Sequence, residues 1–305
     1  MGCRALRRHR PVGGSATLRT FRSSRMINDS SSRAPRAIPN VLTIAGVDPS
    51  GGAGVLADIK AMSALGAYGC GVVAALTAQN TQGVTGVMPV PPAFVRQQIE
   101  TLFADVRIDA VKLGMLGQAP VIETVADSLV RHIPPHLVLD PVMIAKSGDA
   151  LLEDDAVGTL REAILPIATV ITPNLPEAGV LLGGRQVETL PEMRRVAERL
   201  REAMGTHGHR WVLLKGGHLP GDAAIDLLHD GDRMIEMAAP RVDTKNTHGT
   251  GCSLASALAA LLPQAPDVPA AARAAKDYLT QALKHADRLQ VGSGHGPLQH
   301  FWRWW

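Results

Sequence analysis

The sequence predicts a three-layer α/β fold (αβα), in which a mainly parallel central sheet carries helices on both faces. From residue 40 onward, apolar strand-like runs alternate with amphipathic helical segments, and repeated βα alternation is typical of a parallel sheet. Hydrophobic residues make up 46% of the chain and aromatic residues only 3%, so we expect an aliphatic core like that of buried parallel strands. Asp230-Gly231 lies between two apolar runs and predicts a hairpin, which would add an antiparallel edge.

The individual elements follow in chain order. The first apolar run leads through a Gly-rich turn into a helical segment, and two further strand-like runs precede the next helix. The second of these, 84–90, is short and typical of an edge strand; strand and helix patterns then alternate up to the hairpin, and two helices close the chain. Strands are predicted at 41–45, 71–76, 84–90, 110–113, 137–139, 169–172, 211–214, 224–228 and 233–237. Helices are predicted at 54–65, 92–105, 120–132, 154–165, 176–182, 191–204, 253–262 and 270–289.

Residues 1–38 differ from the rest of the chain in charge and in pattern. They contain nine arginines, no lysine and one acidic residue, Asp29, without hydrophobic periodicity, so we expect a disordered Arg/Ser-rich extension. The whole chain carries 31 basic and 28 acidic residues; without the extension, 22 and 27 remain, a net charge of −5. This balance argues against nucleic-acid binding. The extension resembles a transit peptide in composition, and a true start at Met26 is the alternative that we favour.

Residues 39–305 are expected to form a single domain, because no linker or internal repeat divides them. No stretch approaches the roughly 20 apolar residues that a membrane-spanning helix requires. Cys3, Cys70 and Cys252 are widely spaced, so they match neither a disulfide framework nor a zinc-binding pattern. These features are typical of a protein of the reducing cytoplasm.

The loop at 246–252 (NTHGTGC) is the most informative segment, because it opens directly into the apolar helix predicted at 253–262. Its two glycines allow a tight turn, and the first N–H groups of a helix have no internal partner. Such a helix start is a natural receptor for a phosphate or a developing anion. Cys252 lies in this first turn, where we expect its pKa to be lowered. An anion site beside a candidate base indicates phosphoryl transfer.

Polar or chemically distinctive residues follow several of the predicted strands. In open α/β sheets, ligands bind outside the carboxyl ends of the strands, so these residues predict a common site at one edge of the sheet. The residues at strand ends are Asp48, Gln79, Met115, Asp140, Asn174 and Lys215.

Five motifs, taken in order, resemble the hydroxymethylpyrimidine/phosphomethylpyrimidine kinases of thiamine biosynthesis, within the ribokinase-like superfamily. The resemblance runs from about Asn40 to the C-terminus, including the closing segments 294–297 and 304–305, and leaves the N-terminal extension outside. It implies a ribokinase-like fold with the site residues described below. The motifs occupy residues 42–54, 138–143, 172–178, 214–218 and 246–252.

The resemblance assigns the substrate side of the site to residues at the ends of the first strands. Asp48 begins a glycine-rich turn that matches neither a dinucleotide fingerprint nor a P-loop, and the residues alone indicate only a tight turn. The family comparison places Gly46 and Asp48 near the pyrimidine. Gln79 carries both a donor and an acceptor for the ring's amino edge. Met115 and Val142 resemble the apolar positions on either side of the ring, although packing alone would also explain them.

Asn174 and Glu177 resemble the superfamily's Asn-x-x-Glu element, which helps to hold Mg²⁺ and its waters near the nucleotide phosphates. Mg²⁺ keeps several waters, so an amide and a carboxylate suffice as partners. A plain helix start with an early Glu is the alternative. Asp140 is the second candidate for this metal–water network.

The resemblance also implies the nucleotide side and the catalytic loop. Lys215 and Lys245 are placed to reach phosphate oxygens, as is Asn246 at the start of the loop. The N–H groups of Gly249, Thr250, Gly251 and Cys252 would stabilise the transferring phosphoryl group. A cysteine at position 252, where many superfamily members carry Asp, resembles the pyrimidine kinases and a related pyridoxal kinase branch. We therefore expect Cys252 to be the general base.

The implied activity is ATP- and Mg²⁺-dependent phosphorylation of 4-amino-5-hydroxymethyl-2-methylpyrimidine, first to the monophosphate and then to the diphosphate. A pyridoxal/pyridoxine kinase and a non-catalytic pyrimidine-binding sensor are the alternatives. The expected partners are these small molecules and ATP, with neither nucleic acid nor membrane, and family members are commonly homodimers.

Overall fold

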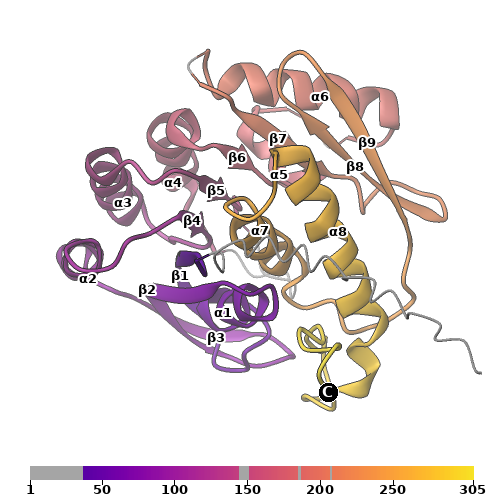
Figure 1. Cartoon of the computed structure of the whole chain (residues 1–305), viewed down its shortest axis with the longest axis horizontal. Helices are drawn as coiled ribbons and strands as arrows, with labels where there is room; N and C mark the ends of the chain where they lie inside the picture. The colour runs from indigo at the N-terminus through magenta and orange to yellow at the C-terminus, as the bar shows by residue number, and fades with distance from the viewer. Residues whose placement is uncertain (1–36, 144–150, 185–186, 207) are drawn as a thin grey trace, which may run out of the picture. The chain divides into compact units, whose positions relative to one another are not determined.

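In the described part of the chain, a nine-stranded sheet runs in the order β3-β2-β1-β4-β5-β6-β7-β8-β9 (Figure 1). The computed structural model describes residues 37–143, 151–184, 187–206 and 208–305. The neighbours from β2 to β7 pair in parallel, whereas β3, β8 and β9 join antiparallel at the two edges. The strands are β1 Asn40–Val47, β2 Tyr68–Gln79, β3 Val84–Pro89, β4 Ala110–Leu113, β5 Leu137–Leu139, β6 Val170–Ile171, β7 Trp211–Lys215, β8 Ala223–His229 and β9 Met234–Pro240.

Helices cover both faces of this sheet. One hydrophobic cluster joins the sheet to α1, α7 and α8, and a second joins its other face to α2, α3, α5 and α6. The helices are α1 Gly54–Ala64, α2 Pro92–Phe103, α3 Ala119–His132, α4 Asp154–Thr159, α5 Leu175–Leu181, α6 Leu190–Ala203, α7 Thr250–Leu261 and α8 Val268–Lys284. A π-helical turn (Leu160–Ile164) and two 3₁₀ turns (Leu165–Ile167 and Ala286–Arg288) complete them. The predicted three-layer, mainly parallel fold is confirmed.

Alternation along the central strands decides which side chains meet which helices. Because neighbouring residues of a strand point to opposite faces, Val41 packs with the α1/α7/α8 layer and Leu42 with the other layer. On β4, Ala110 faces the α1/α7/α8 layer, and Lys112 has the same parity. Lys112 pairs in register with Thr43 of β1, so two polar side chains lie buried under α1 and α7.

Two predicted helices differ from the observed ones. The single helix expected at 154–165 is a short α-helix followed by π and 3₁₀ turns. Pro166 has no N–H for an i→i−4 bond, so an α-helix is unfavourable beyond it, but the change to a π-helical turn begins earlier, at Leu160. The last helix, expected at 270–289, begins earlier at an Asp267 cap and ends at Lys284. Its carboxyl end gives way to a 3₁₀ turn whose Asp287 bonds Thr244 and Asn246.

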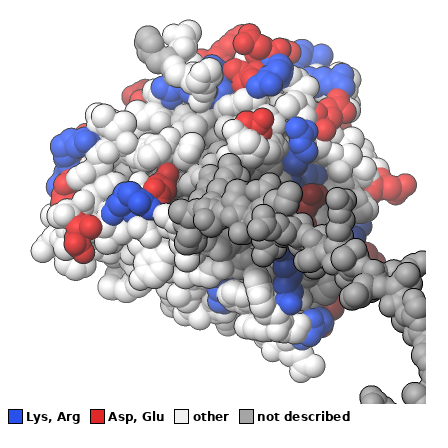
Figure 2. Space-filling model, viewed as in Figure 1, with Lys and Arg blue, Asp and Glu red and all other residues white. Residues whose placement is uncertain are grey.

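Residues from Ile38 to Trp305 form one compact unit. The predicted disorder of residues 1–38 lies outside the described residues, apart from Ala37 and Ile38. None of the helices in the described part of the chain is long and apolar enough to cross a membrane. On the face seen in Figure 2, basic and acidic side chains are interspersed.

Candidate active site

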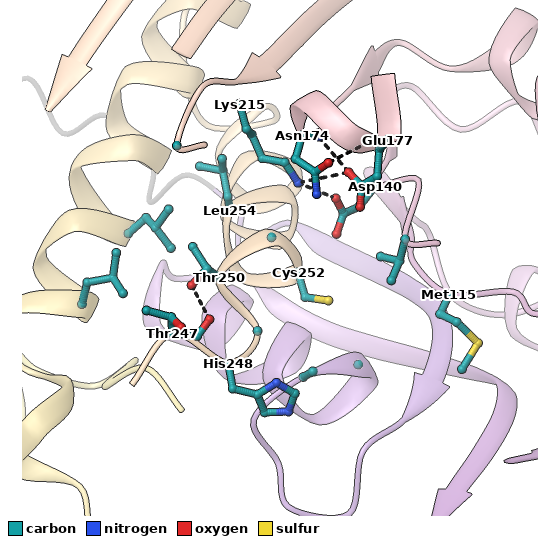
Figure 3. Close-up of a pocket in the computed structure, with 18 of the residues that line it drawn as sticks. Met115, Asp140, Asn174, Glu177, Lys215, Thr247, His248, Thr250, Cys252 and Leu254 are labelled. Carbon is teal, nitrogen blue, oxygen red and sulfur yellow. Dashed lines mark hydrogen bonds and ion pairs between the residues drawn. The ribbon is translucent and has the colours of Figure 1, made fainter. Parts of the chain in front are cut away.

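A cavity of about 760 Å³ lies where the central strands end and α7 begins (Figure 3). Every predicted site residue except Lys245 and Asn246 lines it. The fold brings these residues together from distant parts of the chain: Asp48 and His248, for example, are 200 positions apart and in direct contact. The edge of the sheet that the sequence predicts for ligand binding is therefore the edge that carries the cavity.

Lys245 and Asn246 lie beside the cavity rather than on its wall. The Lys245 side chain is exposed. Asn246 is buried, and its Nδ2 donates to Asp287 Oδ1 at 2.7 Å, which ties the loop to the segment after α8. Their contact with a nucleotide stays a prediction.

The loop before α7 has the geometry of an anion receptor. Gly249 caps the helix with a φ of 77°, and a side chain there would collide with the carbonyl oxygen of Gly52. The Thr250 hydroxyl donates to the Thr247 carbonyl at 2.6 Å. Across the described residues, we find no hydrogen bond from the backbone N–H of Gly251 or Cys252. These two N–H groups are available to a phosphate oxygen.

Cys252 is the third residue of α7, and in Figure 3 its sulfur points towards the side of the cavity where Met115 lies. The expectation of a lowered pKa is wrong. Burial among protein atoms raises the pKa of the Cys252 thiol to about 11, although Lys112 and a hydrogen bond from the Gly54 N–H act to lower it. The loss of hydration outweighs the position in the first helical turn, because the charged thiolate is the form that burial disfavours. The resting cysteine is therefore a thiol.

Asp48 connects the glycine-rich turn after β1 to the loop before α7. Its Oδ2 accepts from His248 Nε2 at 2.7 Å and from the Ala53 N–H at 3.0 Å, and Ser50 donates through both its N–H and its hydroxyl. Burial acts to raise the pKa of Asp48, but the hydrogen bonds from His248 and Ser50 outweigh it and hold the pKa below its usual value. The carboxylate thus clamps two loops, and a contact with substrate stays a prediction.

The remaining predicted substrate residues form a mostly apolar wall. Gly46 donates its N–H to the Met115 carbonyl at 3.1 Å, and a Cβ on Gly46 would strike the Met115 side chain, so glycine permits this close approach. Val142 lines the same cavity. Gln79 is the last residue of β2, and the Thr77 hydroxyl lies 3.1 Å from its Oε1. Its side-chain amide nitrogen remains available to a ring acceptor.

A charged cluster around Lys215 lines another part of the cavity (Figure 3). The Lys215 ammonium donates to Asp140 Oδ1 at 3.1 Å and lies 3.8 Å from Glu177 Oε2. The Thr172 hydroxyl donates to the same Asp140 oxygen at 3.2 Å. Asp140 Oδ2, by contrast, is buried and has no hydrogen-bond partner among the residues that the structure describes. A Cβ on Gly251 would lie 3.6 Å from that oxygen, so the anion-receptor loop borders this cluster.

Asn174 and Glu177 form a capping box at the start of α5. Asn174 Oδ1 accepts from the Glu177 N–H at 2.8 Å, and Glu177 Oε2 accepts from the Asn174 N–H at 2.7 Å. Burial raises the pKa of Glu177 to about 7, against the lowering effect of Lys215. The helix-start interpretation is thus correct, and it leaves metal binding possible through the carboxylate oxygens that the box does not use.

The cluster fits Mg²⁺ held partly through water. Among the described residues, no three His, Cys, Asp or Glu side chains converge as a complete metal cage. Mg²⁺ is commonly bound by one or two carboxylates plus waters and phosphates, and the unpartnered Asp140 Oδ2 supplies one such oxygen. Asp140 and Glu177 are therefore the residues that would hold the ion.

Two buried lysine–aspartate pairs at the cavity were not predicted from the sequence: Lys112 lines the cavity with Asp58 behind it, and both Lys276 and Asp226 line it. Lys112 Nζ lies 2.8 Å from Asp58 Oδ2, and Lys276 Nζ lies 2.6 Å from Asp226 Oδ2. A lysine inside the apolar run 110–113 was a detectable signal for the first pair. The second pair joins an ordinary helical lysine to a strand 50 positions away, which no local pattern reveals.

Comparisons with known proteins decide the family. The chain matches the sequence profile of the family described as phosphomethylpyrimidine kinase over residues 48–299. The chain belongs to the phosphomethylpyrimidine kinase family. It is 50% identical over 266 residues to the hydroxymethylpyrimidine/phosphomethylpyrimidine kinase of Escherichia coli K12. This alignment covers 87% of the present chain and 98% of the relative. The resemblance inferred from the five motifs is confirmed.

Solved structures of similar proteins support the kinase assignment. A phosphomethylpyrimidine kinase of Clostridium difficile is 38% identical, with a TM-score of 0.71 over 81% of this chain and 100% of that one. A pyridoxal kinase of Staphylococcus aureus in complex with AMP-PCP is 30% identical, with a TM-score of 0.78 over 87% and 94% of the two chains. This member of the phosphomethylpyrimidine kinase family is a kinase with a ribokinase-like fold, which makes the sensor alternative unnecessary.

Proposed function

We propose that this kinase transfers the γ-phosphoryl group of ATP to the hydroxymethyl group of 4-amino-5-hydroxymethyl-2-methylpyrimidine, and then adds a second phosphoryl group to the monophosphate, in thiamine biosynthesis. Three features that line one cavity support this proposal: the first N–H groups of α7, which have no partner among the described residues, the Cys252 sulfur and an apolar wall. The Escherichia coli relative, 50% identical, is named for both substrates.

The geometry supports in-line transfer of the γ-phosphoryl group to the substrate in one step. Cys252, as thiolate, accepts the proton of the substrate hydroxyl while that oxygen forms a bond to the γ-phosphorus. The bond from the γ-phosphorus to the bridging oxygen breaks, and ADP leaves. The N–H groups of Gly251 and Cys252 stabilise the charge on the transferring group, with Gly249 and Thr250 shaping the loop. Met115 and Val142 hold the ring between them.

Because the pKa of Cys252 is raised, its thiol must be deprotonated before phosphoryl transfer. A thiol with a pKa of about 11 must lose its proton before it can act as a base. Replacing Cys252 by Ala is expected to lower kcat at saturating substrate by about 10²-fold or more, the usual contribution of a general base. Cys70, a free cysteine of β2 outside the cavity lining, offers the matched control, and Cys70→Ala should leave kcat unchanged. Near-normal turnover by Cys252→Ala would refute the base.

Mg²⁺ would be held by Asp140 and Glu177, with Asn174 nearby. When bound, the ion neutralises charge on the ATP phosphates. Lys215 holds the Asp140 carboxylate in place and offers its own charge to the same phosphates. Burial acts to lower the pKa of Lys215, but Asp140 and Glu177 outweigh it, so the lysine stays charged. Treatment with EDTA should abolish ADP release, and added Mg²⁺ should restore it.

A pyridoxal/pyridoxine kinase is the second candidate, favoured by the structural similarity to a pyridoxal kinase at a TM-score of 0.78. The two activities are separated by comparing kcat/KM for hydroxymethylpyrimidine, its monophosphate and pyridoxal in one assay of ADP release. We expect the two pyrimidines to be preferred. A preference for pyridoxal would reverse the assignment, and turnover of the free pyrimidine alone would limit the enzyme to one step.

We also infer a homodimer that works in the cytoplasm. Leu76 and Met88 lie opposite each other on β2 and β3, and their side chains are 43% and 62% exposed. Apolar side chains paired on the edge of a sheet are typical of an interface, here with a second copy. A monomeric mass in light scattering would contradict this. The free cysteines Cys70 and Cys252 agree with a reducing compartment.

A further inference from the structure

A polar cluster lies buried between the sheet and helices α1 and α7, directly behind the cavity. Lys112 and Asp58 are completely buried, with 2.8 Å between Nζ and Oδ2. The Thr43 hydroxyl donates to the same Asp58 oxygen at 2.6 Å, and the Ser256 hydroxyl donates to Oδ1 at 2.7 Å. Three elements thus hold the Asp58 carboxylate, and the carboxylate holds the lysine. No function proposed above uses this cluster.

The cluster lies on the same side of α7 as the proposed base. Ser256 follows Cys252 by four residues, so the two side chains occupy the same face of the helix. Lys112 lines the cavity that Cys252 lines. Within the described residues its ammonium makes one hydrogen bond, to Asp58, and so keeps donor capacity. The absence of a side chain on Gly114 leaves room for the Lys112 ammonium, since a Cβ there would lie 2.7 Å from Lys112 Nζ.

Four charged residues, from α1, β4, β7 and the segment after β5, act on the Cys252 thiol. Burial has the largest effect and raises its pKa; among the charges, Lys112 acts most strongly and lowers it, whereas Asp58 and Asp140 raise it. Lys215 on β7 is the second positive group. Burial also acts to lower the pKa of Lys112, but the neighbouring Asp58 more than compensates, so Lys112 remains an ammonium.

We propose that Lys112 is a positioning residue for the base: held by Asp58, it keeps a positive charge behind Cys252 and stabilises the thiolate that receives the substrate's proton. The thiol first loses its proton to solvent, and after transfer it returns the substrate's proton to solvent. The inference rests on Cys252 as the base in the proposed function, but the charge coupling itself can be measured without substrate.

The first test measures alkylation of Cys252 by iodoacetamide as a function of pH, in a Cys3→Ser/Cys70→Ser background. Loss of a nearby positive charge should raise the thiol pKa by about one unit or more. The fraction of Cys252 present as thiolate then falls about tenfold. A thiolate with a higher pKa is the stronger nucleophile, which offsets part of this loss, so Cys252 in Lys112→Met should be alkylated about threefold more slowly at pH 8. Lys60→Met is the matched control, because Lys60 lies on the same helix as Asp58 but its ammonium bonds the Gly51 carbonyl.

A second variant guards against misfolding, since Lys112→Met leaves Asp58 buried without its partner. Lys112→Met/Asp58→Asn keeps the cluster neutral and should also slow alkylation, because Lys112 acts on the thiol more strongly than Asp58 does. Alkylation at the rate of the background protein in both variants would overturn the proposal.

The second test measures kcat against pH. In Lys112→Met the rising limb should move to higher pH, so that activity lost at pH 7 returns as the pH is raised. A merely structural defect would lower kcat equally at every pH and would overturn the positioning role. Slower alkylation combined with an unchanged kcat profile would instead reject Cys252 as the base, and with it the proton transfer, while the coupling between Lys112 and the thiol would stand.

Discussion

Lys112 and Lys215 line the same cavity, and their surroundings differ. Lys112 has one carboxylate partner, Asp58, whose own oxygens are satisfied by Thr43 and Ser256. Lys215 lies between two carboxylates, Asp140 and Glu177, and its side chain is 14% exposed against 0% for Lys112. The first cluster therefore pairs one positive with one negative group and is neutral.

The cluster around Lys215 has an excess of negative charge and an unpartnered oxygen, Asp140 Oδ2. Buried polar atoms are normally satisfied, so this oxygen is open to a hydrogen-bond donor or a cation. Under the proposals above, an ion pair at this site serves as a fixed charge at Lys112 and as part of a cation site at Lys215. Substitutions at the two clusters should therefore have different consequences.

The largest difference is expected in stability. Lys112→Met leaves Asp58 as an unpaired buried charge and should cost about 3–5 kcal/mol in the free energy of unfolding. Lys215→Met should cost less, because Glu177, whose pKa is already raised to about 7, can take up a proton. Urea denaturation of both variants, with the slope m compared, measures this. Equal losses would mean that the two clusters are equivalent.

The next effect is a pH dependence of stability in the metal-free protein. The folded-state pKa of Glu177, about 7, lies above its ordinary value of 4.5. As the pH rises from 4.5 to 7 the unfolded chain ionises first, so the native state loses stability, and the loss is complete above pH 7. Glu177→Gln should remove about 1–3 kcal/mol of the difference between pH 5 and pH 8. Unfolding in EDTA tests this, and identical pH profiles would contradict it.

The smallest effect, on the Mg²⁺ requirement, is expected from changing Asp140 Oδ2, the carboxylate oxygen described above as lacking a hydrogen-bond partner. Asp140→Asn keeps an acceptor for Lys215 and Thr172 but replaces Oδ2 by a donor. The Mg²⁺ concentration for half-maximal activity should rise at least about tenfold, since loss of a metal-site group typically weakens affinity by that amount or more. Titration of activity with Mg²⁺ measures the change, and Thr172→Val provides a control beside it. An unchanged Mg²⁺ requirement would place the ion elsewhere.

Much of the fold and of the site's membership was predictable because the signals are local. The periodicity of apolar residues indicated the strands and helices, and the rule that ligands lie at strand ends placed Asp140 and Lys215 at one edge. Errors occurred where a local pattern was incomplete. The segment at 154–165 changes to a π-helical turn at Leu160, ahead of Pro166, and the end of α8 depends on contacts of Asp287 with the loop before α7.

By itself, the sequence determined the three-layer fold, the family and the cavity-lining role of most candidate residues, because side-chain periodicity and short motifs act through neighbours along the chain. Tertiary structure alone decided the direction of the Cys252 pKa shift and the pairing of Lys112 with Asp58. A thiol's pKa depends on how much water and charge surround it, and here those come from β4, α1 and the segments after β5 and in β7. The first turn of a helix favours a thiolate, but the loss of hydration among the protein atoms around Cys252 opposes it more strongly.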